Sequence, residues 1–162
     1  MFSDIIKNYH PSSKVWIFQP NRLLNQNEID LITTNATIFN NKWNAHGANL
    51  SSVFNCTPYE ITFVVDANAN QASGCSIDSL TQFIKQVQQN IDVDFFNRMM
   101  VTYKENDTYK IAHYTTLTKI NQIVLDNTVS NLQDYLNRTQ LKAKNLDDIM
   151  DYIKILSMVK RN

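Results

Sequence analysis

The feature that most constrains the fold is the order in which two kinds of hydrophobic pattern follow one another along the chain. Short runs rich in β-branched and aromatic residues, typical of strands, occupy residues 15–18, 52–56, 59–66, 99–103 and 108–114. Between them lie two longer stretches, residues 25–43 and 76–91, whose apolar side chains recur at three- and four-residue steps. The sequence therefore predicts strand, helix, two strands, helix, two strands.

This order contains the βαββαβ pattern of a ferredoxin-like plait, an antiparallel sheet with helices on one face. We therefore expect an α+β fold of this kind with an extra strand and C-terminal helices. A chain of 162 residues, 43% of them hydrophobic, suits one domain with an ordinary core. The predicted domain has a core at residues 14–125 and a C-terminal helical extension at residues 126–162.

Residues with capping preferences mark the ends of the two main helices. Asn25, with Glu28 three residues later, predicts a capping pair at the start of the first helix. Gly47 is expected just past the end of that helix, where a left-handed backbone favours glycine. Ser76 is expected to cap the second helix.

Two more helices are expected towards the C-terminus. A short one should start near Thr116 and continue to about Val124, and a longer one should begin with Asn145 as its cap. Acidic residues in the first turn of the longer helix and basic residues at its end complement the helix dipole. Its narrow apolar face can cover its own domain, dock a partner or pair with a second copy as a homodimer.

The balance of charge and the scarcity of glycine exclude several functions. Fifteen basic and fifteen acidic side chains give no net charge that would attract nucleic acid or an anionic membrane. Two glycines are too few for a Gly-rich phosphate loop. His10, His46 and His113 lack the spacing of metal ligands. We therefore expect no nucleic-acid partner, no metal and no cofactor.

The N-terminal residues lack the basic and apolar segments of a signal peptide, and no later run approaches the roughly 18 apolar residues of a membrane span. We therefore predict a soluble, cytoplasmic protein without a membrane partner. In that reducing compartment, Cys56 and Cys75 are expected to be free thiols.

The predicted topology brings three distant segments to one rim of the sheet. Right-handed crossovers place the end of the first helix, the end of the third strand and the start of the second helix near one another. The first segment carries His46 and Gly47, and the second ends at Asp66. The third segment consists of Ser73, Gly74, Cys75 and Ser76.

One interpretation of this rim is an enzyme that uses a thiol. Cys75 lies at a helix start, where free N–H groups and the positive dipole end favour a thiolate. His46 would serve as the base and Asp66 as the group that orients its imidazole. These roles are those of thiol-dependent acyl or amide transfer or hydrolysis on a small substrate.

The alternative is a module that binds a small molecule or an anion with no covalent step. The backbone N–H groups of Ser73, Gly74 and Ser76, with Gly47 nearby, would then form the ligand site. Each residue also has an ordinary structural explanation. Cys75 can pack beneath a helix, His46 can bond the last carbonyls of the preceding helix, and Asp66 can form a turn.

Five segments of the chain resemble a family of small, uncharacterised bacterial proteins of about this length. They are Val15-Trp16-Ile17-Phe18-Gln19, Trp43-Asn44-Ala45-His46-Gly47, Val65-Asp66, Ala72-Ser73-Gly74-Cys75-Ser76-Ile77-Asp78-Ser79 and Asp94-Phe95-Phe96-Asn97-Arg98. The resemblance covers roughly residues 14–124. Members are sometimes labelled ABC transporter ATPases, but this chain has no G-x-x-x-x-G-K-[ST] loop, so we expect no such activity. The resemblance implies only that the His46-Gly47 and Gly74-Cys75 positions match family motifs.

Overall fold

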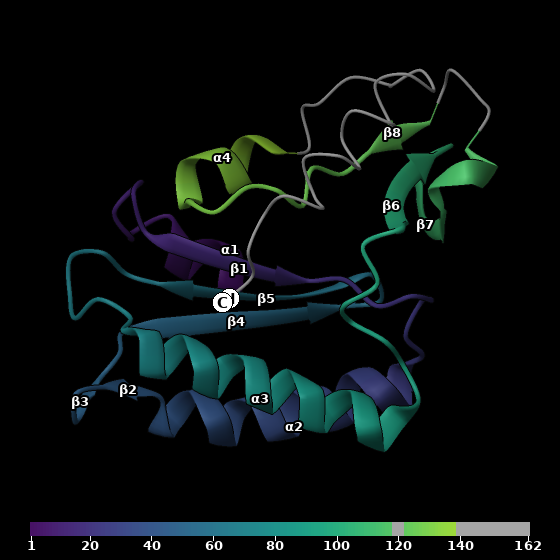
Figure 1. Ribbon diagram of the computed structural model, residues 1–162. Coiled ribbons are helices and arrows are strands. Elements are labelled where there is room, and N and C mark those ends of the chain that lie inside the picture. Colours follow the sequence, from purple (N-terminus) through teal and green to yellow (C-terminus); the bar gives the residue numbers. More distant parts are fainter. Residues whose placement is uncertain (118–121, 139–162) are drawn as a thin grey trace.

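The centre of the fold is a three-stranded antiparallel sheet, seen in a computed structural model that describes residues 1–117 and 122–138 (Figure 1). Its strands are β1 (Lys14–Phe18), β4 (Ser52–Thr57) and β5 (Glu60–Val65), in the order β1-β5-β4. The two hairpin arms that the sequence predicts at residues 52–56 and 59–66 are therefore confirmed, with Thr57 opposite Glu60 next to the turn.

β5 is the central strand, and both of its faces are buried. All six of its residues are buried. Ile61, Phe63 and Val65 point to one hydrophobic cluster, and Val64 points to another on the opposite face. A strand with this composition needs cover on both sides, since each buried aliphatic or aromatic side chain contributes about 1.5–3 kcal/mol.

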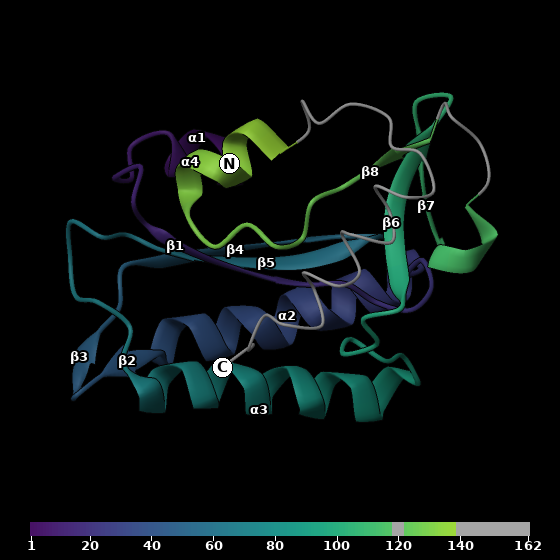
Figure 2. The ribbon, with the colours of Figure 1, turned by 45° about the horizontal axis from the view of Figure 1, so that its top comes forward.

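Helices cover both faces of the sheet, as Figures 1 and 2 show. α2 (Gln26–Lys42) and α3 (Gly74–Ile91) lie side by side on one face, and α1 (Phe2–Ile6) and α4 (Leu132–Asn137) lie on the other. The expectation of helices on one face only is wrong, because Val15 and Ile17 of β1 and Val64 of β5 form a second apolar face, which Ile6 of α1 and Leu132 of α4 cover.

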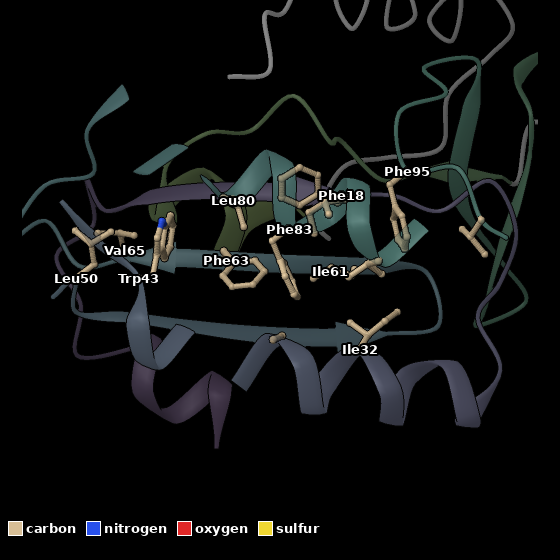
Figure 3. Packing of buried hydrophobic residues seen from close by; sticks show 14 of the residues in the cluster. Phe18, Ile32, Trp43, Leu50, Ile61, Phe63, Val65, Leu80, Phe83 and Phe95 are labelled. Atoms are coloured by element: carbon tan, nitrogen blue, oxygen red, sulfur yellow. The ribbon is translucent and has the colours of Figure 1, made fainter. Parts of the chain in front are cut away.

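The larger core lies between the sheet and the α2–α3 pair (Figure 3). The ring of Phe39 on α2 stacks on Phe83 of α3, with centroids 4.8 Å apart, and meets Phe63 of β5 edge-on at 5.8 Å. Ile32 and Leu80 are fully buried beside these rings. This aromatic packing fixes both helices against β5, and therefore fixes their ends at the rim.

A second antiparallel sheet follows α3. It consists of β6 (Met100–Glu105), β7 (Thr108–His113) and β8 (Ile123–Val124), in the order β7-β6-β8. The hairpin predicted from residues 99–114 is confirmed, and Asn106 and Asp107 adopt positive φ angles of 50° and 63° in its turn. Two such residues match the hairpin turns that suit the twist of antiparallel strands.

The prediction of an α+β fold is confirmed, but the strand after α3 departs from the plait. A plait needs that strand beside β1, whereas β6 pairs with β7 and β8. The outer edge of β1 instead meets a short extended segment, where the Val15 N–H donates to the Ser130 carbonyl and Lys14 forms a bridge with Asn131. The described strands thus match only the first three of the plait.

Several predicted helix ends are shifted. The Asn25–Glu28 capping box of α2 is confirmed, but α2 ends at Lys42, before Gly47. The cap of α3 is Ser73, with Ser76 as its third helical residue. A hydroxyl three residues earlier can bond the Ser76 amide, which accounts for the difference.

The helix expected from Thr116 to Val124 is wrong, because its described parts are the 3₁₀ turn η1 (Tyr114–Thr116) and strand β8. The helix expected from Asn145 onward lies outside the described residues.

Candidate functional site

The end of α2 and the start of α3 meet at one rim of the sheet. The buried indole of Trp43, the residue that caps the C-terminus of α2, donates a 2.8 Å hydrogen bond from Nε1 to the Ser76 carbonyl. The Trp43 ring also packs against Phe39 and Phe63 at centroid distances of 5.5 and 5.8 Å. One side chain thus joins the ends of two helices that are far apart in sequence.

The first turn of α3 is closed by two serines. The Ser73 Oγ accepts from the Ser76 N–H at 3.2 Å, and the Ser76 Oγ accepts from the Ser73 N–H at 2.6 Å. Within the described part of the chain, the amides of Gly74 and Cys75 donate no hydrogen bond. These two N–H groups therefore remain at the positive end of the helix dipole.

His46 lies in a tight turn between the short strands β2 (Asn44–Ala45) and β3 (Ala48–Asn49). His46 and Gly47 adopt positive φ angles of 54° and 81°, and the Gly47 N–H donates to the Asn44 side chain at 3.3 Å. Gly47 therefore serves this turn rather than the end of α2. A positive φ at a residue with a side chain costs roughly 1–2 kcal/mol, so the turn places the exposed His46 in a backbone conformation that most residues avoid.

These segments enclose an open pocket of about 340 Å³. Ile38, Phe39, Lys42 and Trp43 line it from the last turns of α2. Its other lining residues are polar: Asn44, His46, Ser73, Cys75, Ser76 and Ser79. Of the predicted site residues, the structure brings His46, Ser73, Cys75 and Ser76 to this pocket.

The two cysteines are free thiols in different surroundings. Cys75 is exposed on the first turn of α3, so it does not pack beneath the helix. Cys56 lies on β4, where burial raises the pKa of its thiol to about 12 and keeps it protonated at neutral pH. Cys75 is therefore the thiol available to a solute.

Asp66 does not join the pocket. Its Oδ1 accepts hydrogen bonds from the amides of His10 and Asn68, at 3.2 and 3.0 Å, and from the Ser13 hydroxyl at 3.5 Å. Among the described residues, no hydrogen bond or ion pair joins Asp66 to His46. The carboxylate holds the turn after β5 and the loop before β1, which is the turn-forming role open to an Asp at a strand end.

Sequence reasoning missed the contribution of α2. Lys42 and Ile38 line the pocket, although neither belongs to the motifs around His46 and Cys75. Their four-residue spacing places them on one face of the helix, next to Trp43. This spacing, together with the position of both residues near the end of α2, is the sequence feature from which their place in the pocket could have been predicted.

No protein-family model, curated protein or solved structure matches this chain. The resemblance to small bacterial proteins therefore stays a prediction. Among the residues described, no group of three or more His, Cys, Asp or Glu side chains is placed to hold a metal. No helix within residues 1–117 and 122–138 has the length and apolar character to cross a membrane.

Proposed function

We propose that the pocket at the start of α3 binds a small anion. The observation that carries this proposal is the charge of the lining. Lys42 supplies a positive charge and His46 an imidazole, and no Asp or Glu of the described chain lines the pocket. The amide of the lining residue Cys75 and that of its neighbour Gly74 add hydrogen-bond donors at the start of α3.

Each of these attractions is weak alone. A charge at an exposed helix terminus, like an exposed ion pair, is worth up to about 1 kcal/mol. In this proposal Lys42 and the start of α3 act on the same bound anion, so their contributions to its binding add. Anion binding at this pocket is therefore expected to be modest in affinity and to weaken as salt is added.

The test is a titration with inorganic phosphate, followed by the backbone amide signals of Gly74 and Cys75 in ¹H–¹⁵N NMR spectra. Lys42→Gln should weaken binding about 2- to 5-fold, as expected for the loss of one exposed charge. Lys85→Gln removes a charge from the exposed face of α3 outside the pocket, so it should change nothing. Equal binding by all three proteins would contradict the proposal.

Thiol chemistry is a second candidate, because the exposed Cys75 shares the pocket with His46. The thiolate would attack the carbonyl carbon of a small ester or amide, forming a thioester. The alcohol or amine would leave with a proton from the His46 imidazolium, and water would then hydrolyse the thioester and restore the thiol. Asp66 is bonded elsewhere, so His46 would act without the orienting carboxylate.

This candidate predicts a burst of about one equivalent of p-nitrophenol from p-nitrophenyl acetate, lost in Cys75→Ser and slowed in His46→Gln. Iodoacetamide at pH 8 should label Cys75 and spare Cys56. The Cys56 thiol has a pKa of about 12, so very little of it is thiolate at pH 8. Labelling of Cys56 should rise only as the pH approaches 12. An absent burst, with labelling of Cys75 unchanged in His46→Gln, would argue against thiol catalysis and leave anion binding untouched.

A further inference from the structure

The end of α2 contributes an apolar wall to the pocket, formed by Ile38, Phe39 and Trp43, and this wall is partly exposed to solvent. Ile38 is 54% exposed, and it lines the pocket together with Phe39 and Trp43. Lys42 lies one turn beyond Ile38 on the same helix face. The pocket therefore has two chemically distinct sets of groups. One set is the aliphatic and aromatic side chains at the end of α2, and the other is polar, with Lys42 on α2 and the donor groups at the start of α3.

An inorganic anion would contact only the polar groups of the pocket. Phosphate at the Gly74 and Cys75 amides would leave Ile38 in water, whereas an apolar group beside the anion would cover it. Removing apolar surface from water is favourable by roughly 25 cal/mol per Å². The apolar wall thus supplies binding free energy only to a ligand that has an apolar part.

The wall is already in place before any ligand arrives. Trp43 is 3% exposed, is hydrogen-bonded to the Ser76 carbonyl and packs on Phe39 and Phe63. A side chain packed and hydrogen-bonded in this way is already ordered before a ligand binds, so little binding free energy is lost to ordering it.

We infer that the ligand is a small organic acid with a branched or aromatic apolar group, an inference that depends on the proposed anion site. Its carboxylate would lie at the Gly74 and Cys75 amides and near Lys42, and its apolar group would cover Ile38. A volume of about 340 Å³ lies at the small end of ligand pockets, which span roughly 300–1,000 Å³. The ligand is therefore nearer in size to phenylacetate than to a nucleotide.

The experiment compares acetate, phenylacetate and the neutral 2-phenylethanol as probes, followed by the amide signals of Gly47 and Gly74. These are the two glycines of the chain, and each is the sequence neighbour of a lining residue, His46 or Cys75. Phenylacetate should bind at least about tenfold more tightly than acetate, as expected for partial burial of a phenyl ring. 2-Phenylethanol should bind more weakly than phenylacetate because it carries no charge.

Two matched variants assign this preference to the wall. Ile38→Ser should bring phenylacetate close to the affinity of acetate while acetate binding stays unchanged. Leu31→Ser is the control, since Leu31 is 44% exposed on the same helix two turns earlier but does not line the pocket. Both side chains are exposed, so both variants should keep the thermal unfolding midpoint of the parent protein.

The outcomes separate this inference from the proposed function. Equal affinities for acetate and phenylacetate would overturn the organic-acid inference and leave the anion site standing. Binding of 2-phenylethanol as tightly as phenylacetate, or a failure of all anions to bind, would overturn the anion site and the inference with it. Loss of the preference in Leu31→Ser, or its survival in Ile38→Ser, would remove Ile38 from the ligand site.

Discussion

At the scale of single residues, Glu60 and Arg138 form a buried ion pair away from the pocket. Their side chains are each 4% exposed, and one guanidinium nitrogen of Arg138 lies 2.7 and 2.9 Å from the two Glu60 oxygens. The Thr62 hydroxyl donates to Glu60, and Arg138 donates to Asn127. The pair joins β5 to the end of α4, and removing either partner would leave a buried charge uncompensated.

Arg138→Met is therefore expected to lower the free energy of unfolding by about 3–5 kcal/mol, measured by urea denaturation at pH 7. The double variant Glu60→Gln with Arg138→Met removes both charges and should lose less than the sum of the two single losses. Strictly additive losses would show that the two side chains do not interact.

This pair could not be predicted from sequence, because 78 positions separate its members. Glu60 follows a turn and Arg138 follows a short helix, and both positions are ordinarily solvated. Asp66 illustrates the same limit at the rim. Asp66 follows β5 as the sequence predicts, but its carboxylate accepts hydrogen bonds from the His10 amide and the Ser13 hydroxyl, and no hydrogen bond among the described residues joins it to His46. A side chain's partner depends on loops whose path the sequence pattern does not specify.

At the scale of helices and strands, hydrophobic periodicity and capping residues are sufficient to predict the position of elements that have a strong local pattern. The Asn25–Glu28 box, the β4–β5 hairpin and the apolar stripe of α3 all lie where the sequence predicts them. These patterns are local, since each is decided by residues within one turn or one strand. The convergence of α2 and α3 at one rim follows from them through the right-handed crossover.

The elements that differ are those decided by competition between distant segments. β6 was expected beside β1 but pairs with β7 and β8, and Ser130 takes part of the edge of β1. A strand pattern in the sequence indicates that a segment pairs with another strand, but it does not indicate which strand edge the segment pairs with. The start of α3 differs for a smaller reason, because Ser73 and Ser76 are both good capping residues and only their geometry selects Ser73.

At the scale of the whole molecule, two hydrophobic clusters on opposite faces of one sheet leave the pocket at their edge. The larger cluster contains Trp43 and Phe83, and the smaller one contains Val64 and Leu132. The larger cluster supplies Trp43 to the pocket lining, which also contains the exposed residues His46 and Cys75. The homodimer, the cytoplasmic location and the role of the helix from Asn145 onward stay predictions.

The most direct test of the anion site changes the charge at Cys75 while keeping its position. Cys75→Asp places a carboxylate among the donors of the first turn, where an acidic residue also favours the helix, so folding should be retained. In the phosphate titration, Cys75→Ser should bind like the parent protein and Cys75→Asp should show no shift of the Gly74 amide. Undiminished phosphate binding by Cys75→Asp would contradict an anion site at the start of α3.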